Sequence, residues 1–562
     1  MKASPQAPIK KFVPCTFPAY NDDDAKLSFS WNPPDSMGDS KSRSRGHIVM
    51  LPFMAHGHLI PFLALARRIR RHAPFAAVTL AATPLNLRYL RSTMCPDDDD
   101  SGIRLRELPF RSSDHGLPPD SENTENLPYS QIATLFHSSL ALAAPVERLI
   151  SDITAEEGRP PLCVIADVFF GWSVDVARRL GTKSIAFTTG GAYGSLAYAS
   201  IWLNLPHRST DAEEFSVPGF PERCRFHRSQ LHRYIREADG SDQWSKFFQI
   251  QIKLSLAADG WLCNSVEEIE PLGFDLLRKH LKLPVWAIGP LVPPHMLQKS
   301  SPVSPNSTLK SLQKHAGKAL GLSIEKCLDF LNSHGQNSVL YISFGSQNTM
   351  SPSQMMQLAI GLESSGKPFL WVIRPPLGFD IKGEFRPEWL PPGFEDRVTG
   401  SKQGLLVRNW APQLDILSHG STGAFLSHCG WNSTMESLSQ GVPIVGWPMA
   451  AEQAYNAKMM VDEMGVCVEL TRGVESRIEA EAVKQVIEMV TEEEGKGREM
   501  KKRAHAVMEQ MREAVKEGCE DGEQGSSVKA MDEFVRTILG DSTNGALSFP
   551  QVNFHSKSVV QL

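Results

Sequence analysis

The stretch FLSHCGWNSTMESLSQGVPIVGWP, residues 425–448, decides the fold class. It consists of an apolar strand that ends at His428, a short helix that stops at Gly441, and a second apolar strand up to Pro448. Ser433 and Glu436 have the spacing of a capping box, which predicts that the helix begins near Ser433. Strand, helix and strand in this order form the repeating unit of a parallel sheet with helices on its faces.

The same unit recurs along most of the chain. Apolar strands and amphipathic helices alternate from His47 onward. A stretch rich in Pro, Ser and Lys interrupts this alternation, which begins again near residue 338. We therefore expect an α/β protein with two tandem doubly wound, Rossmann-like parallel-sheet domains and a ligand site in the cleft between them. The predicted boundaries are a disordered N-terminal extension (1–45), a first domain (46–290), a linker (291–323), a second domain (324–540) and a C-terminal tail (541–562). Met37 is a candidate start of a shorter protein, a hypothesis that mass spectrometry of the native N-terminus tests.

Composition and charge argue against several classes of function. The net charge of −5 comes from mixed acids and bases, so we expect no nucleic acid partner. No apolar run is long enough to span a membrane, and the first residues contain no apolar signal region. The nine cysteines form no CxxC pair and are interpreted as free thiols of a cytosolic protein. Without an obvious dimer helix or exposed apolar strand, we expect a monomer.

Familiar phosphate and metal motifs are also missing from the sequence. No GxGxxG follows a predicted strand and no GxxxxGK[ST] occurs, which argues against a dehydrogenase or a P-loop nucleotidase. The run Asp97–Asp100 has no neighbouring His or Glu, so we interpret it as a solvated charge run rather than a metal site. We expect no metal and no tightly bound cofactor.

The turn inside the opening stretch is suited to an anion. A strand that runs directly into a helix offers free backbone N–H groups and the positive end of the helix dipole, a combination that binds phosphate. Gly430 allows close approach of the backbone, and His428 can add a hydrogen bond. A plain capped helix with a packed tryptophan is the alternative, and composition alone does not decide between the two.

A longer stretch resembles a known family. Residues 410–453, WAPQLDILSHGSTGAFLSHCGWNSTMESLSQGVPIVGWPMAAEQ, resemble the 44-residue signature box of plant family 1 UDP-sugar-dependent glycosyltransferases of small molecules, which have the GT-B fold. The segments YISFGSQNTMS, GLESSGKPFLWVIR and LPPGFEDR resemble the second domain of that family, and LPFMAHGHLIP and VIADVFFGWSVDVA resemble the first. The resemblance covers about residues 45–540, and the first 40 or so residues have no counterpart in the family.

The resemblance implies a donor site for a UDP-sugar. Trp410, Ala411 and Gln413 match the uracil pocket, Glu436 matches the ribose contact, and Ser346, His428, Asn432 and Ser433 match the diphosphate contacts. Trp431, Glu452, Gln453 and Thr189 match positions that face the sugar, with Thr188 as an alternative to Thr189. A final Gln resembles glucose users, but Glu452 stands where the family more often has Asp, which weakens the glucose prediction. Trp410 as a core residue and Glu436 as a capping residue are the structural alternatives, and His419 is assigned a packing role.

The first domain is expected to supply the chemistry. Transfer of a sugar to an alcohol needs a base, and histidine is the natural base near neutral pH. The residues alone do not choose between His56 and His58, but His58 matches the family's H-x-x-P position, which leaves His56 a supporting role. Asp167, at a strand end, matches the carboxylate partner; a helix N-cap is its alternative role, and Asp175 is the weaker candidate.

The resemblance thus implies an inverting transfer of glucose from UDP-glucose to a hydroxyl of a small hydrophobic metabolite, such as a flavonoid, phenylpropanoid, terpenoid or hormone. The alternatives are another UDP-sugar (galactose, xylose, rhamnose or glucuronate), a catalytically silent UDP-sugar-binding protein, and a UDP-sugar epimerase.

Overall fold

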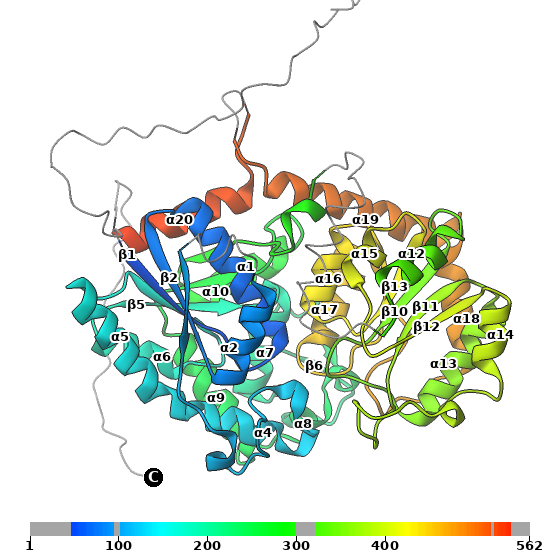
Figure 1. Ribbon diagram of the computed structural model, residues 1–562, viewed down its shortest axis with the longest axis horizontal. Coiled ribbons are helices and arrows are strands. Elements are labelled where there is room, and N and C mark those ends of the chain that lie inside the picture. Colours follow the sequence, from blue (N-terminus) through cyan, green and yellow to red (C-terminus); the bar gives the residue numbers. More distant parts are fainter. Residues whose placement is uncertain (1–45, 95–101, 299–320, 519–521, 541–562) are drawn as a thin grey trace, which may run out of the picture. The chain divides into compact units, whose positions relative to one another are not determined.

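The computed structural model describes residues 46–94, 102–298, 321–518 and 522–540 (Figure 1). The predicted extension, the predicted tail, most of the predicted linker and the run Asp97–Asp100 lie outside the described residues. Six cysteines are described, and all six are free and buried, as expected for unpaired thiols.

The first sheet has seven parallel strands in the order β3-β2-β1-β4-β5-β8-β9. Strands β1, β2 and β4 are buried along their whole length because helices cover both faces of the sheet. The order reverses between β1 and β4, and in such sheets ligands bind beyond the carboxyl ends of the strands at the point of reversal. The strands are β1 (Gly46–Leu51), β2 (Ala76–Ala82), β3 (Ile103–Glu107), β4 (Cys163–Asp167), β5 (Lys183–Thr188), β8 (Gly260–Cys263) and β9 (Val285–Ala287).

Helices follow the strands of this sheet, and a small hairpin of β6 (Glu214–Ser216) and β7 (Arg225–His227) is inserted after α7. The helices are α1 (His56–His72), α2 (Pro84–Thr93), α4 (Tyr129–Ser138), α5 (Ala143–Glu157), α6 (Trp172–Arg179), α7 (Ala192–Asn204), α8 (Arg233–Glu237), α9 (Gln243–Ser255) and α10 (Pro271–Leu281).

The second sheet has six parallel strands in the order β12-β11-β10-β13-β14-β15. Its strands are β10 (Val339–Ser343), β11 (Phe369–Ile373), β12 (Gly404–Arg408), β13 (Thr422–Ser427), β14 (Ile444–Gly446) and β15 (Cys467–Glu469). Its helices are α12 (Ile324–Asn332), α13 (Pro352–Ser365), α14 (Phe394–Gly400), α15 (Gln413–Ser418), α16 (Trp431–Leu438), α17 (Gln453–Met459), α18 (Ala480–Thr491) and α19 (Gly495–Ala514). The two parallel sheets confirm the predicted α/β class.

The last described helix corrects the predicted extent of the second domain. Helix α20 (Ser526–Leu539) falls within 324–540 but packs on the first sheet, as Figure 1 shows. Met531, Phe534, Val535 and Ile538 of α20 are buried in the core that contains α1, β1 and β2, and the Phe534 ring lies 5.4 Å from that of Trp286. The apolar stripe of α20 therefore completes the first domain.

The predicted capping box at Ser433 is wrong. Helix α16 begins at Trp431 with Gly430 as N-cap, and no side chain caps it. Gly430 has an extended backbone, so the chain turns into the helix two residues earlier than predicted. Ser433 and Glu436 consequently bond to Gln413 instead of to the helix end.

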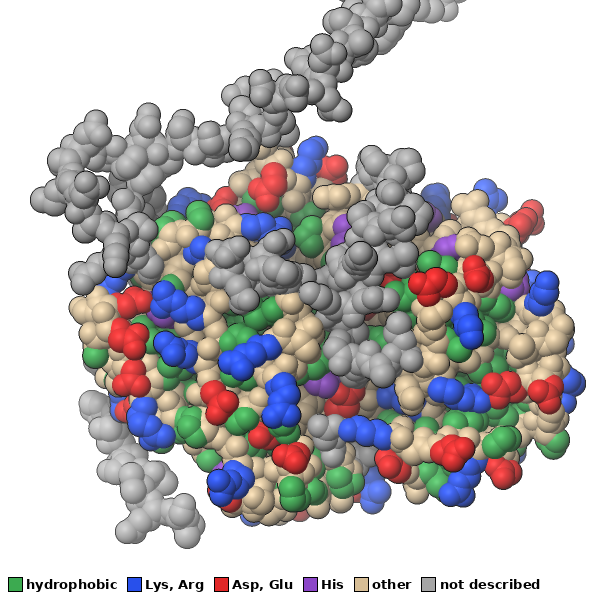
Figure 2. All heavy atoms as spheres, in the orientation of Figure 1, with side chains coloured by type: hydrophobic (Ala, Val, Ile, Leu, Met, Phe, Trp, Pro, Cys, Tyr) green, Lys and Arg blue, Asp and Glu red, His purple; other side chains and the backbone are tan. Residues whose placement is uncertain are grey.

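The surface agrees with the mixed charge of the sequence. On the face in Figure 2, basic and acidic side chains are interspersed over both domains. In the part of the chain that the structure describes, no helix combines the length and apolarity needed to cross a membrane.

Candidate active site

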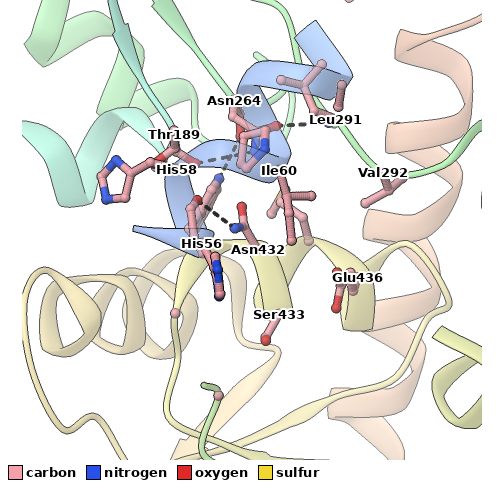
Figure 3. Close-up of a pocket in the computed structure, with 18 of the residues that line it drawn as sticks. His56, His58, Ile60, Thr189, Asn264, Leu291, Val292, Asn432, Ser433 and Glu436 are labelled. Atoms are coloured by element: carbon pink, nitrogen blue, oxygen red, sulfur yellow. Dashed lines mark hydrogen bonds between the residues drawn. The ribbon is translucent and has the colours of Figure 1, made fainter. Parts of the chain in front are cut away.

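A cavity of about 1110 Å³ lies between the two domains. Its walls come from segments that follow β1, β4, β5 and β8 of the first sheet and β10, β12 and β13 of the second. Figure 3 shows α16, with Asn432, Ser433 and Glu436, facing α1, with His56, His58 and Ile60. The carboxyl ends of both parallel sheets thus meet at one site, as the fold prediction required.

His58 and Asp167 form a hydrogen-bonded pair in this cavity. His58 lies in the first turn of α1, Asp167 ends β4, and His58 Nδ1 lies 2.6 Å from Asp167 Oδ2. Asp167 is 1% exposed, and its Oδ1 accepts a hydrogen bond from Phe169 N at 3.0 Å. Burial lowers the pKa of His58, but the charge and hydrogen bond of Asp167 outweigh burial, so the pKa is raised above its ordinary value of 6.5. With Nδ1–H donated to the carboxylate, Nε2 is left as a proton acceptor.

The competing candidates have other contacts. His56 forms an ion pair with Glu125 and stacks on Tyr89, with ring centroids 3.9 Å apart. Asp175 lies on α6, is half-exposed, and pairs with Arg178 at 3.2 Å. Both histidines therefore pair with a carboxylate, His58 with Asp167 and His56 with Glu125, whereas Asp175 pairs with an arginine.

The predicted nucleoside contacts lie together on the second domain. Gln413, at the start of α15, donates from Nε2 to Ser433 Oγ (3.0 Å) and to Glu436 Oε2 (2.5 Å), and its Oε1 accepts from Tyr341 at 3.1 Å. Burial raises the pKa of Glu436 to about 7, against a lowering by the Gln413 hydrogen bond. Trp410 and Ala411 line the same cavity beside Gln413.

The predicted phosphate contacts surround His428 at the end of β13. The side chain is buried between two glycines: a Cβ at Gly345 would lie 2.6 Å from His428 Nε2, and one at Gly430 would lie still closer. Burial, followed by the charge of Arg374, lowers the pKa of His428 to about 4, so the imidazole is neutral. Arg374 lines the cavity and donates from Nη1 to Ser346 O at 2.6 Å, which places a cation beside this loop.

Trp431 and Asn432 connect the domains. Trp431 is 3% exposed and donates from Nε1 to Asn264 O at 2.6 Å, while Asn432 Nδ2 donates to Gly57 O at 2.9 Å. The tryptophan of the opening stretch is therefore buried against the first domain. Both residues also line the cavity.

The remaining predicted sugar contacts lie at the start of α17 and the end of β5. Gln453 Oε1 accepts from the N–H groups of Met449 and Ala450, both at 2.9 Å. Burial raises the pKa of Glu452, against a lowering by His58 and Asn456. Thr188 Oγ1 is bonded to Ser195 Oγ at 2.6 Å, and both Thr188 and Thr189 line the cavity.

Sequence reasoning missed several residues that hold this site. Asn264 follows β8; its Oδ1 accepts from Leu291 N (2.9 Å) and its Nδ2 donates to Thr189 O (3.3 Å), so one side chain joins two loops (Figure 3). Its backbone O accepts the hydrogen bond from Trp431. Glu270 accepts from the N–H groups of Ala192 and Tyr193 at the start of α7, and burial raises its pKa to about 7. Arg374 was missed as well. A polar residue directly after a buried strand was the available signal for Asn264 and Arg374.

Comparison with known proteins identifies the family. Residues 294–496 match the family model described as UDP-glucoronosyl and UDP-glucosyl transferase, and residues 46–293 match that of the glycosyltransferase N-terminal domain. The chain is 46% identical to crocetin glucosyltransferase 3 of Crocus sativus over 464 residues, covering 80% of this chain and 92% of the relative. The chain belongs to the plant family 1 UDP-glycosyltransferases. A second family member, UDP-glycosyltransferase 92A1 of Arabidopsis thaliana, is 42% identical over 506 residues, covering 89% of this chain and 98% of that protein.

Solved structures of other UDP-glycosyltransferases have the same fold. The Glycyrrhiza uralensis enzyme complexed with glycyrrhetinic acid 3-O-monoglucuronide matches with a TM-score of 0.73 and 26% identity, covering 88% of this chain and 96% of that one. A transferase from Siraitia grosvenorii in complex with UDP matches with a TM-score of 0.68 and 27% identity, covering 88% and 99%. The predicted GT-B fold is confirmed, and the protein is a glycosyltransferase that uses a UDP-sugar.

Proposed function

We propose that this UDP-glycosyltransferase transfers glucose from UDP-glucose to a hydroxyl group of a small, flat, hydrophobic metabolite, with inversion at the anomeric carbon. The observation that carries the proposal is the pair of His58 and buried Asp167, 2.6 Å apart, on a cavity shared by both domains. A raised pKa makes the imidazole a stronger base, and the first-domain side of the cavity is apolar enough for a hydrophobic acceptor.

In the proposed reaction, His58 Nε2 takes the proton of the acceptor hydroxyl as its oxygen forms a bond to the anomeric carbon. Asp167 holds the imidazole in the required tautomer and stabilises the imidazolium that forms. The bond from the anomeric carbon to the phosphate oxygen breaks on the opposite face, so the α-linked sugar becomes β-linked, and UDP leaves with the electron pair.

The second domain would bind the donor and its departing charge. Trp410, Ala411, Gln413 and Glu436 line the cavity; Trp410 would stack on uracil beside Ala411 and Gln413, and Glu436 would accept hydrogen bonds from the ribose hydroxyls. The N-terminus of α16, His428, Ser433 and Ser346 would hold the diphosphate, and Arg374 supplies a positive charge next to this group. Asn432 would also hold the diphosphate, and Trp431, Glu452, Gln453 and Thr189 would face the sugar; all five residues line the cavity.

Glucose is proposed as the sugar because of the acid–Gln pair Glu452–Gln453 and because relatives named as glucosyltransferases, including crocetin glucosyltransferase 3, match most of the chain. Glu452 carries one methylene more than the aspartate common at that position, so another hexose donor is the alternative that the assay must include.

The test is mass spectrometry of the full chain incubated with UDP-glucose, UDP-galactose, UDP-xylose, UDP-rhamnose or UDP-glucuronate and a panel of phenols and terpenoid alcohols. We expect addition of a hexose from UDP-glucose, and we expect the His58→Gln variant to bind UDP but to form product at least about 10³-fold more slowly. A His56→Gln variant is the matched control and should keep most of the activity. Preference for a different sugar would replace glucose, whereas UDP binding without transfer from any donor would support the silent binding protein.

A further inference from the structure

The acceptor side of the cavity has aromatic walls. Phe53 lies 4.4 Å from Phe136, Phe136 lies 5.2 Å from Phe248, and Phe169 lies 5.3 Å from Phe248, as measured between ring centroids. Tyr198 continues the same wall, and all of these residues line the cavity. Surfaces built from ring faces and edges favour a flat aromatic or conjugated body over a bulky one.

His232 interrupts this apolar wall. It is the N-cap residue of α8, but its side chain makes no capping hydrogen bond and lies against the cavity instead. The ring centroid lies 6.3 Å from Tyr198 and 6.3 Å from Trp202. Its Nε2 is buried and has no hydrogen-bond partner among the residues that the structure describes. A buried polar atom without a partner costs free energy, and a molecule in the cavity is able to supply the missing partner.

The surroundings keep His232 uncharged. Burial and, to a smaller extent, the charge of Arg236 lower its pKa to about 4. The aromatic rings next to His232 are those of Tyr198, Trp202 and Tyr234. Arg236 is the charged group that shifts its pKa, and among the described residues no carboxylate is found to raise it. A neutral imidazole has one donor and one acceptor nitrogen, which suits an uncharged hydroxyl or carbonyl group.

His232 lies at the far end of the wall from the proposed base. The Phe169 ring lies 5.5 Å from His58 and 6.5 Å from Tyr198, and Tyr198 lies 6.3 Å from His232. Two aromatic side chains therefore separate the two histidines. A molecule with about two conjugated rings along this wall would place one end at His58 and the other at His232.

We propose that His232 binds a second oxygen of the acceptor, remote from the hydroxyl that receives the sugar. The preferred acceptors are then flat, conjugated molecules with a hydroxyl group at one end and a hydroxyl or carbonyl group at the other. This inference rests on the proposed function, because it takes the first-domain side of the cavity as the acceptor site.

The test compares two probes that differ only in the remote oxygen, trans-4-hydroxystilbene and trans-4,4′-dihydroxystilbene. Their dissociation constants are measured by isothermal titration calorimetry on the full chain saturated with UDP, so that no transfer is needed. The wild-type protein should bind the dihydroxy compound about tenfold more tightly. His232→Phe should bind the two compounds alike, and His232→Leu provides a second variant if the phenylalanine does not fit.

A matched control is His505→Phe, which changes an exposed histidine of α19 and should keep the tenfold preference. Equal affinities in the wild type, a preference that survives in both His232 variants, or no binding of either stilbene would overturn the inference. Transfer of glucose to the same compounds is measured separately. Selective binding without transfer would refute the proposed function and leave the role of His232 intact.

Discussion

Replacing Asp167 by asparagine removes a negative charge that is 1% exposed and lies 2.6 Å from His58 Nδ1. In the proposed reaction His58 accepts the proton of the substrate, becomes an imidazolium and gains the full attraction of that carboxylate. With charge centres about 4 Å apart and an effective dielectric constant of about 20, the attraction is roughly 4 kcal/mol. We therefore expect Asp167→Asn to lower kcat about 10³-fold.

The dependence of kcat/KM on pH distinguishes a loss of the Asp167 charge from a general loss of structure. The base must be neutral to act, and its pKa is raised above 6.5, so kcat/KM of the wild type should fall as the pH drops through a value above 6.5. Without the charge of Asp167, burial of His58 remains, so the acid limb of the variant should move below 6.5. The assay is UDP release with saturating UDP-glucose, measured between pH 5 and pH 9.

Asp175→Asn is the matched control, because Asp175 is half-exposed on α6 and pairs with Arg178. It should leave both kcat and the acid limb unchanged, and the Asp167 variant should keep its affinity for UDP. A loss below about tenfold in Asp167→Asn, with an unshifted acid limb, would refute the reasoning about this pair.

Three further predictions concern the donor side. Trp410→Ala should weaken UDP binding about 10- to 100-fold in calorimetry through lost stacking on uracil, and unchanged affinity would argue against that contact. Arg374→Gln should weaken UDP binding by a similar factor because it removes a cation next to the diphosphate site, whereas Arg397→Gln, which breaks an exposed pair with Glu363, should have no effect. Gly345→Ala should abolish most UDP binding, since the added Cβ would clash with His428 Nε2. The control is Gly366→Ala: Gly366 has a similarly positive φ, but no atom would lie within 4 Å of the added Cβ, so this variant should lose only stability.

Much of the architecture could be predicted from the sequence, because buried parallel strands are short apolar runs with glycine or proline at their ends. The two sheets and the strand-end positions of Asp167 and His428 followed from that pattern. The error at Ser433 has a local cause, because the S-x-x-E spacing fits a capping box as well as it fits two side chains that bond to a distant glutamine.

Contacts between distant segments could not be predicted. The packing of α20 on the first sheet depends on an apolar stripe that suits either domain, and the sequence gives no preference. Asn264 stands directly after a buried strand, but its hydrogen-bond partners lie in other loops, so its contacts could not be predicted. His232 is a single polar residue that lines the cavity, and neither spacing nor periodicity singles it out. The choice of His58 over His56 depended on the family resemblance, because the structure pairs each of the two imidazoles with a carboxylate, Asp167 for His58 and Glu125 for His56.

The most direct test of the central claim is the configuration of the product. The wild-type protein is incubated with UDP-α-glucose and a phenol that it accepts, and the anomeric proton of the isolated glucoside is examined by NMR spectroscopy. Direct attack assisted by His58 predicts a β-glucoside whose formation is lost in His58→Gln. An α-glucoside, or a β-glucoside that His58→Gln forms at the wild-type rate, would contradict the account.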